Sequence, residues 1–347
     1  MKISWRISIF VVFFASLAFA QAPVSPLMDI LKTWKLAFVR DKDIWVSNGD
    51  GTDQKLLIKN ADNPSWSPNK KRIAFMRDCN LWVANSDGSK ERPLTSHWKK
   101  DSCRMFASSI SWNPKEPFIT FSHPEKFIVY RSDTDGILER KSNLPQSICG
   151  NSIFDITVDG NSSTKAVSRF DIYEGGTSFN FADHANPAWS CSGEKLAFTR
   201  NGDIWIAEKE PAEQGEENLS LGWDVTRISA TASYDEPTYR ASRENHGATH
   251  FSWSPDEKYL AYSNIRLQGS GFAKLHLRDM KSGRDRVLAD YALDPSFSPD
   301  GRFVAYWTYS GVQPKECGRS GCIWIISLDG KTKQMLVSDA VQPAWCH

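Results

Sequence analysis

The stretch Asn63–Val83, NPSWSPNKKRIAFMRDCNLWV, decides the fold. It contains a short aromatic strand, a Ser-Pro-Asn turn, an apolar strand and a tight polar turn, and it ends in a strand that carries Trp82. An Asp-Gly turn and an outer strand follow. The pattern predicts a sheet of four antiparallel strands, and such a sheet cannot bury its aromatic faces alone.

The opening of this unit, an aromatic residue followed by a predicted turn, recurs along the chain. The other copies are Ser109–Pro114, Asn186–Cys191, Phe251–Asp256, Pro295–Asp300 and Gln342–His347. Copies spaced by about 40–50 residues are typical of sheets arranged as blades around a ring. The intervals that end at Trp189 and Trp253 are longer, and we interpret residues 144–185 as an inserted hairpin.

The two ends of the chain complement each other. The last copy stops after a first strand, Gln342–Cys346, whereas the first copy begins with a second strand, Lys35–Arg40. Joining them completes one blade and removes a free sheet edge, which would promote aggregation. We therefore predict an all-β fold: a six-bladed β-propeller with four-stranded antiparallel blades over residues 35–347, closed when Gln342–Cys346 joins the N-terminal blade.

The repeated residues resemble those of a known family. Trp or Phe before Ser-Pro-Asp or Ser-Pro-Asn, Ala-Phe or Ala-Tyr in the second strand, Ile-Trp or Leu-Trp in the third and Asp-Gly before the fourth are similar to the WD-repeat-like unit of TolB-type propellers. The resemblance covers about residues 35–347, which corresponds to the propeller portion of TolB without its separate α/β domain. It implies protein–protein contacts near a bacterial envelope.

The N-terminus has the pattern of a secretory signal peptide. Lys2 and Arg6 precede the apolar run Ile7–Leu17, and Ala18-Phe19-Ala20 offers a cleavage site. We expect residues 1–20 to be removed, which leaves a periplasmic or secreted protein with no stable membrane span. Residues 21–34 predict a short helix whose apolar stripe either packs on the propeller or docks a partner.

Composition excludes one class of partner. The chain of 347 residues is 40% hydrophobic and 24% charged, with a formal net charge of +1. A nucleic-acid-binding surface needs a basic stripe that neutralises phosphates, and this near-neutral balance does not provide one. We expect no nucleic acid.

Seven cysteines fit an oxidising compartment, and the odd number leaves at least one thiol unpaired. Cys317 and Cys322 bracket a short excursion within one hairpin, so they are the first disulfide candidate. Cys79 and Cys103 lie at the same end of one blade and are the second. Cys191 and Cys346 belong to opposite blades and are not expected to pair. No Cys-x-x-Cys pair indicates zinc, and we predict no metal and no cofactor.

The long loops fall on one face of the predicted ring. They include residues 96–108, 144–185 and 231–250. Loops concentrated at one end of a rigid scaffold are the usual place for a binding site. Polar and aromatic residues in or beside this loop face are the candidate ligand- or partner-binding residues: Arg40, Arg77, Trp98, His123, His184, Arg200, His246 and His250. The arginines form either an anion-binding ring or ion pairs with acidic neighbours such as Asp43 and Asp78.

No motif in the sequence specifies catalysis: there is no Gly-x-Ser-x-Gly elbow, His-Glu-x-x-His pair, phosphate loop or dinucleotide fingerprint. The favoured function is therefore a non-catalytic module that binds a protein partner, a small ligand or a glycan on the loop face. The alternative is a propeller enzyme of the polysaccharide lyase or hydrolase type, which would use His184, His246, His250 and an arginine at the channel mouth.

Overall fold

The computed structural model describes residues 26–78, 80–95, 109–115, 118–123, 129–133, 136–140, 152–157, 184–200, 203–209, 223–228, 248–264, 273–308 and 317–346. Within these ranges a short helix, α1 (Pro26–Leu31), precedes an all-β body that comprises β1 to β25. No helix in the described ranges is long and apolar enough to span a membrane.

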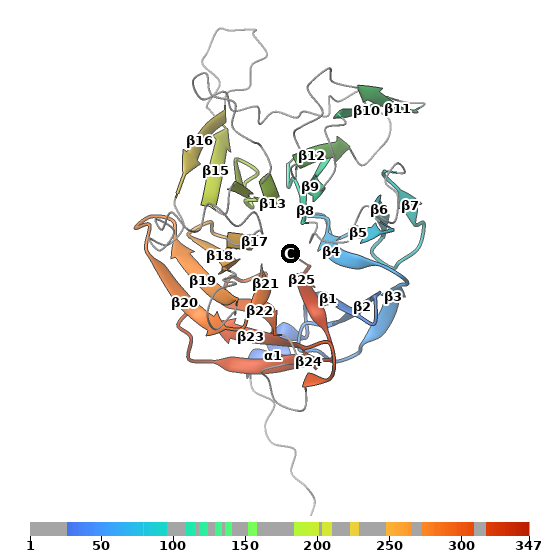
Figure 1. Ribbon diagram of the computed structural model, residues 1–347. Coiled ribbons are helices and arrows are strands. Elements are labelled where there is room, and N and C mark those ends of the chain that lie inside the picture. Colours follow the sequence, from blue (N-terminus) through green and yellow to red (C-terminus); the bar gives the residue numbers. More distant parts are fainter. Residues whose placement is uncertain are drawn as a thin grey trace, which may run out of the picture.

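Five four-stranded antiparallel sheets form blades around a central axis, as Figure 1 shows along that axis. In four of them the strands follow the chain from the axis outward. These blades are β4 (Asp62–Trp66), β5 (Arg72–Arg77), β6 (Asn80–Asn85) and β7 (Arg92–Pro93); β13 (His184–Trp189), β14 (Lys195–Arg200), β15 (Asp203–Lys209) and β16 (Trp223–Arg227); β17 (Ala248–Trp253), β18 (Tyr259–Asn264), β19 (Lys274–Asp279) and β20 (Asp285–Asp290); and β21 (Leu293–Phe297), β22 (Phe303–Thr308), β23 (Cys322–Ser327) and β24 (Lys333–Ser338).

The fifth blade joins the two ends of the chain. Its strand order is β25 (Val341–Trp345), β1 (Lys35–Arg40), β2 (Asp43–Asn48) and β3 (Lys55–Ile58). In the β25–β1 ladder, Leu36 lies opposite Trp345 and Ala37 opposite Ala344. The predicted pairing of the C-terminal strand with the N-terminal blade is therefore confirmed.

The prediction of six four-stranded blades is wrong, because the described residues form five. Where another such blade was expected, β8 (Ile110–Trp112), β9 (Phe118–His123) and β12 (Ser152–Thr157) form a three-stranded sheet in the order β12-β9-β8. The next hairpin along the chain, β10 (Val129–Asp133) and β11 (Gly136–Arg140), pairs only with itself. The reason is that β12, from the stretch interpreted as an insertion, occupies the edge of β9, with Ser152 opposite His123.

The core lies between neighbouring blades. An aromatic side chain at the same position of the second strand is fully buried in each four-stranded blade: Phe38, Phe75, Phe198, Tyr262 and Tyr306. Of the inner-strand tryptophans, Trp189, Trp253 and Trp345 are buried as well. Each buried aromatic ring removes a large apolar area from water, so this repetition accounts for most of the cohesion between blades.

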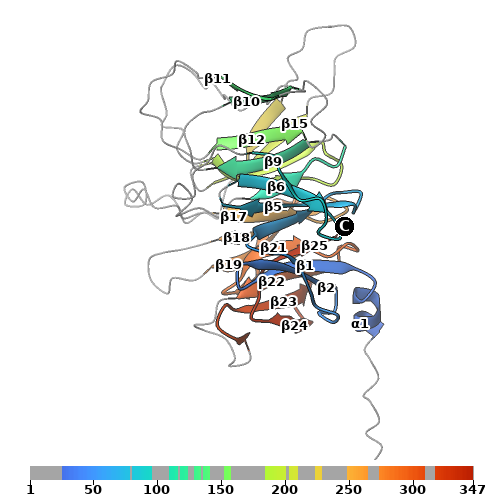
Figure 2. The same cartoon turned by 90° about the vertical axis from the view of Figure 1, so that its right-hand side faces the viewer.

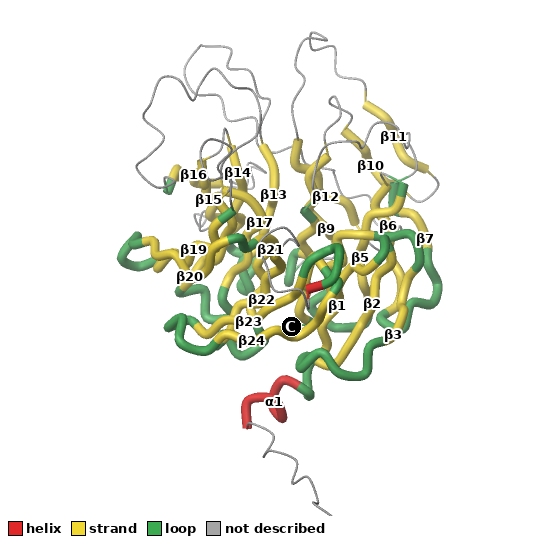
Figure 3. The backbone as a smooth tube through the Cα atoms, turned by 60° about the horizontal axis from the view of Figure 1, so that its bottom comes forward, coloured by secondary structure: helices red, strands yellow, loops and turns green. Residues whose placement is uncertain are grey.

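Helix α1 lies outside the ring of strands, next to the closing blade (Figures 2 and 3). Leu31 is fully buried in the cluster that contains Trp345, and Met28 and Trp34 pack against the same cluster. The contact is close: a Cβ added to Gly49 would lie 2.4 Å from the carbonyl oxygen of Leu31. Of the predicted stripe of Leu27, Ile30, Leu31 and Trp34, the residues Leu31 and Trp34 pack on the propeller as expected, while Ile30 remains 38% exposed.

The predicted disulfide between Cys317 and Cys322 is present. Cys191 and Cys346 are both free thiols, so the two do not pair with each other. Partial desolvation, reinforced by the nearby carboxylates of Glu257 and Asp256, raises the pKa of the exposed Cys191 thiol to about 11, so it stays protonated near neutral pH. The second disulfide candidate, Cys79 with Cys103, lies outside the described residues.

Candidate functional site in the central channel

A cavity of about 370 Å³ runs along the axis of the ring. Its walls come from the innermost strands of the five blades and of the three-stranded sheet, namely β4, β8, β13, β17, β21 and β25. The same repeated segment therefore contributes to the lining from every side. A rigid cavity of this kind, formed by convergent polar and aromatic groups, is the usual form of a ligand site.

Hydrogen bonds link each inner strand to the next, all the way around the channel. In each bond the donor belongs to the repeated aromatic residue of one inner strand. The acceptor belongs to the residue just before the repeated aromatic residue of the neighbouring inner strand. Trp66 Nε1 donates to Ala344 O (3.2 Å), Trp112 Nε1 to Ser65 O (2.9 Å), Trp189 N to Ser111 Oγ (2.9 Å), Trp253 Nε1 to Ala188 O (3.0 Å), Phe297 N to Ser252 Oγ (3.0 Å) and Trp345 N to Ser296 Oγ (3.0 Å).

Each inner strand of the five four-stranded blades has a residue with a left-handed backbone three positions before its aromatic residue. These residues, called the polar tier below, are Asn63 (φ 51°), Asn186 (φ 58°), His250 (φ 48°), Asp294 (φ 49°) and Gln342 (φ 53°). The strand pairing shifts register in each of the five sheets at this level, which is the signature of a β-bulge. Bulges re-aim side chains, and asparagine, aspartate and histidine are among the residues that tolerate this conformation best.

Two pairs of polar-tier residues join neighbouring blades. Gln342 Nε2 donates to Asn63 Oδ1 at 3.0 Å, and the Asn63 backbone N–H donates to Gln342 Oε1 at 3.0 Å. On another seam, His250 Nδ1 lies 2.9 Å from Asp294 Oδ1. This second contact is an ion pair that lacks the alignment of a hydrogen bond, since Nδ1 makes none.

The His250–Asp294 pair is largely buried, with side chains only 16% and 15% exposed. Burial disfavours the charged imidazole, yet the Asp294 carboxylate outweighs it and raises the pKa of His250 above its ordinary value. Burial likewise opposes the charged carboxylate, but His250 and the indole N–H of Trp307, which donates to Asp294 Oδ2 at 2.6 Å, lower the pKa of Asp294. The pair is therefore charged at mildly acidic pH.

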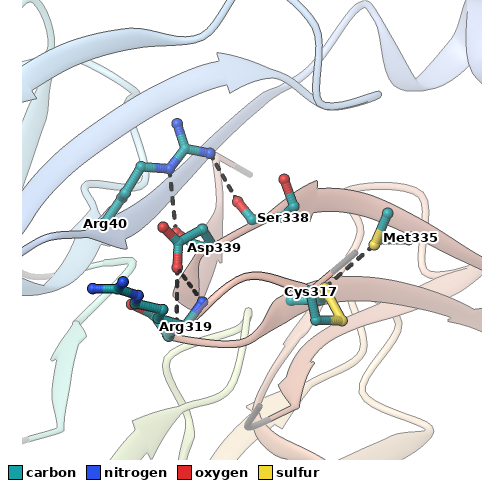
Figure 4. Close-up of a disulfide and its surroundings, with 8 residues drawn as sticks. Arg40, Cys317, Arg319, Met335, Ser338 and Asp339 are labelled. Carbon is teal, nitrogen blue, oxygen red and sulfur yellow. Dashed lines mark hydrogen bonds between the residues drawn. A yellow bond between two sulfur atoms is a disulfide. The ribbon is translucent and has the colours of Figure 1, made fainter. Parts of the chain in front are cut away.

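Arg40 and Arg77 occupy equivalent positions at the ends of β1 and β5. Arg40 donates to the carbonyl oxygens of Ser338 (2.9 Å) and Asp339 (3.2 Å), in the connection that leads from β24 to β25. Figure 4 shows this contact beside the Cys317–Cys322 disulfide. In the same figure Asp339 Oδ1 accepts hydrogen bonds from the backbone N–H groups of Arg319 and Ser320.

Arg77 repeats the arrangement one blade further on. It donates to the carbonyl oxygens of Lys59 (2.8 Å) and Asn60 (3.3 Å), in the connection from β3 to β4, and pairs with Glu91 at 2.5 Å. Its guanidinium carbon lies 4.8 Å from the centroid of the Trp82 ring, as that of Arg40 lies 5.2 Å from Trp45. Both arginines thus link consecutive parts of the ring through backbone carbonyls and are not part of the cavity lining, and ligand binding by either stays a prediction.

Replacing Arg40 with glutamine is expected to lower the free energy of unfolding by roughly 2 kcal/mol, because two charge-assisted hydrogen bonds between blades are lost. Chemical denaturation measures the change. The matched control is Lys55→Ala on the exposed edge of the same blade, where Lys55 pairs only with Asp53; it should change the value by less than about 0.5 kcal/mol. Equal effects of the two substitutions would contradict the seam role of Arg40.

The other predicted site residues are only partly placed. His123, His184 and Arg200 lie in β9, β13 and β14, and His184 stands opposite Arg200 in the ladder. The side chains of these three residues, and all of Trp98 and His246, lie outside the described residues. Asn63, Asp294 and Gln342 were missed as site residues, although each is a polar residue at the same distance before the repeated aromatic residue.

The ring of sheets around a lined channel defines the chain as a β-propeller. The family model of the dipeptidyl peptidase IV N-terminal region matches residues 50–112 and 162–269. No curated protein is significantly similar in sequence.

Solved structures share this fold. TolB from Acinetobacter baumannii superposes with a TM-score of 0.59 at 18% identity, over 91% of this chain and 67% of that chain. A chain of the nidogen–laminin complex gives 0.55 at 9% identity, over 90% and 98%. A protein designated TolB from Agrobacterium tumefaciens gives 0.51 at 12% identity, over 88% and 87%. The resemblance to TolB-type propellers is therefore confirmed at the level of the fold.

Proposed function

We propose that this protein is a periplasmic or secreted, non-catalytic binding module that receives a protein partner or a small ligand at the loop-face end of its channel. The observation that carries the proposal is the polar tier. It lies near the start of the inner strand of each four-stranded blade, at the end of the cavity into which long connections of the chain, such as 96–108 and 229–247, lead. Binding residues are commonly held in this way, by loops on a rigid frame.

The pairing within the polar tier favours binding over catalysis. Asn63 with Gln342 and His250 with Asp294 satisfy each other across blade seams. Groups that are already paired and fixed present a preorganised surface, which lowers the entropic cost of binding. The leader-like residues 1–20 and the similarity to TolB proteins support the proposed location.

The test is capture of a partner by residues 21–347, immobilised and exposed to envelope extract and culture fluid, followed by identification and by binding of the purified partner. Replacing residues 231–247 with a short Gly-Ser linker should reduce capture at least tenfold. The matched control changes Lys281 and Lys331 to glutamate in turns at the opposite end of the blades and should leave capture unchanged. Loss of capture in the control alone would refute the placement on the loop face.

One observation favours the enzyme alternative: the imidazole of His250 lines the channel with its Nδ1 2.9 Å from Asp294 Oδ1. A histidine beside a carboxylate is a common general base. If His250 has that role, His250→Gln removes turnover of a polysaccharide substrate while partner capture persists. A screen that finds no turnover in the wild type leaves the binding module as the function.

A further inference from the structure

A second ring of side chains lies two residues beyond the polar tier, one position before each repeated aromatic residue. In four of the six inner strands this residue is a serine, and the serine tier is Ser65, Ser111, Ser252 and Ser296. The other two positions are Ala188 and Ala344. All four serines line the cavity and are half-buried.

The serine hydroxyls have donor hydrogens that no described residue accepts. The oxygen atoms of Ser111, Ser252 and Ser296 accept backbone N–H groups of the next strand, at 2.9, 3.0 and 3.0 Å. A serine hydroxyl can accept and donate at the same time. Among the described residues, no acceptor receives a hydrogen bond from any of these three hydroxyls, and the hydroxyl of Ser65 makes no side-chain hydrogen bond there.

The side-chain oxygen atoms of the polar-tier residues that line the cavity, in contrast, already have partners. Asn63 Oδ1 accepts a hydrogen bond from Gln342 Nε2, and Gln342 Oε1 accepts one from the backbone N–H of Asn63. Asp294 Oδ1 faces His250, and Asp294 Oδ2 accepts from Trp307. Ser111, Ser252 and Ser296 therefore contribute spare hydrogen-bond donors to the channel. A ligand group that only accepts hydrogen bonds fits such a lining, and an ionised carboxylate is such a group.

Charge selects among acceptor groups. Of the described lining residues only His250 and Asp294 carry charged side chains, and at mildly acidic pH, where both are ionised, their charges cancel. A dianion such as phosphate would lie in this channel without a compensating cation, which is costly, whereas a single negative charge held by several hydroxyl donors costs less.

We propose that the channel binds a carboxylate group through the hydroxyl hydrogens of Ser111, Ser252 and Ser296. This inference deepens the proposed function and rests on it only for the biological source of the carboxylate. The group could belong to a small organic acid or to the C-terminus of a polypeptide partner, because both present the same two oxygen atoms to the serine tier.

The decisive experiment is a titration of residues 21–347 with sodium acetate at constant ionic strength, followed by tryptophan fluorescence and by the melting temperature. Acetate should bind, and acetamide, which has the same shape but no charge, should bind at least tenfold more weakly. Equal binding of acetate and acetamide, or no binding of acetate, would overturn the proposal. Neither outcome depends on capture of a partner, so failure here is distinct from failure of the proposed function.

Substitutions locate the site. Ser252→Ala and Ser296→Ala should each weaken acetate binding by about tenfold, because each removes one hydrogen bond to a charged group. The matched control is Ser298→Ala: Ser298 Oγ also accepts a backbone N–H, from Phe303 at 3.0 Å, but Ser298 is not part of the cavity lining. It should leave acetate binding unchanged. Threonine at 252 or 296 keeps a hydroxyl and should restore binding, which separates loss of the donor from loss of folding.

Two peptide probes distinguish the sources. If a tripeptide with a free C-terminus binds more tightly than acetate and its C-terminal amide does not bind, the site recognises the end of a polypeptide. Tighter binding of acetate than of the tripeptide assigns it to small acids. Binding of the amide as tightly as the free acid contradicts a carboxylate site altogether.

Discussion

Deletion of residues 341–347 is expected to abolish the cooperative unfolding transition of the propeller. The deletion removes β25, which forms the inner strand of the closing blade, and with it Trp345, only 2% exposed in the cluster that also holds Leu31 and Leu36. Loss of a buried tryptophan alone costs about 3–5 kcal/mol, and a folded domain has only about 5–15 kcal/mol in total. The exposed edge of β1 would then promote association between chains.

Circular dichroism during heating and size-exclusion chromatography measure this outcome. The control is removal of His347 alone, which should preserve both the transition and the monomer or oligomer distribution of the wild type. Trp345→Phe should keep the fold with a lower melting temperature, because the ring closure is intact but the packing is poorer. A native-like transition in the protein without residues 341–347 would show that β25 is dispensable.

Asp294→Asn is expected to destabilise the protein by roughly 3 kcal/mol at mildly acidic pH, since the charged His250 would lie largely buried without its counter-charge. The raised pKa of His250 stabilises the fold fully below the ordinary histidine pKa and loses this effect as the pH rises through the raised pKa. The lowered pKa of Asp294 stabilises the fold above the ordinary aspartate pKa and loses this effect as the pH falls through the lowered pKa.

The difference in unfolding free energy between wild type and variant should therefore be largest between about pH 4 and pH 6.5 and should shrink in more alkaline solution. Denaturant titrations across this range give the profile. Asn at 294 still offers an oxygen to Trp307, so that contact is largely kept. The control is Asp279→Asn at the end of β19, where the carboxylate accepts the backbone N–H groups of Lys281 and Ser282 and not a histidine; its effect should not shrink above about pH 6.5. A difference that is flat with pH would contradict a charged His250–Asp294 pair.

The sequence predicts the local units of this fold well because each blade repeats its own signals. The turn residues and the alternating apolar strands identify the blades, and the mismatched ends, Lys35–Arg40 and Gln342–Cys346, identify the closure. The sheet built on β8 is where the prediction fails. Its third strand, β12, carries no repeat signature and pairs with β9 across a long stretch of chain, so neither period nor turn residues could place it.

The candidate site was harder to predict because it arises between blades. Arg40 and Arg77 were identified as equivalent residues, but their partners are backbone carbonyls of the preceding connection, which no side-chain pattern reveals. His250 was singled out, whereas its partner Asp294 was not, since the two residues meet only when the strands β17 and β21 stand side by side. The left-handed backbone of the polar tier likewise follows from bulges that the sequence does not mark.

The ladder between β1 and β25 also constrains how this chain reaches its native state. Arg40 and Asp339, which meet at this seam, are 299 residues apart, so their contact closes a loop that contains most of the chain. Such distant contacts carry a large loop-closure entropy and slow the final step of folding. Until that step, the edge of β1 lacks its neighbour, and a chaperone that shields Lys35–Arg40 would be expected to raise the yield more than one that acts on any other strand.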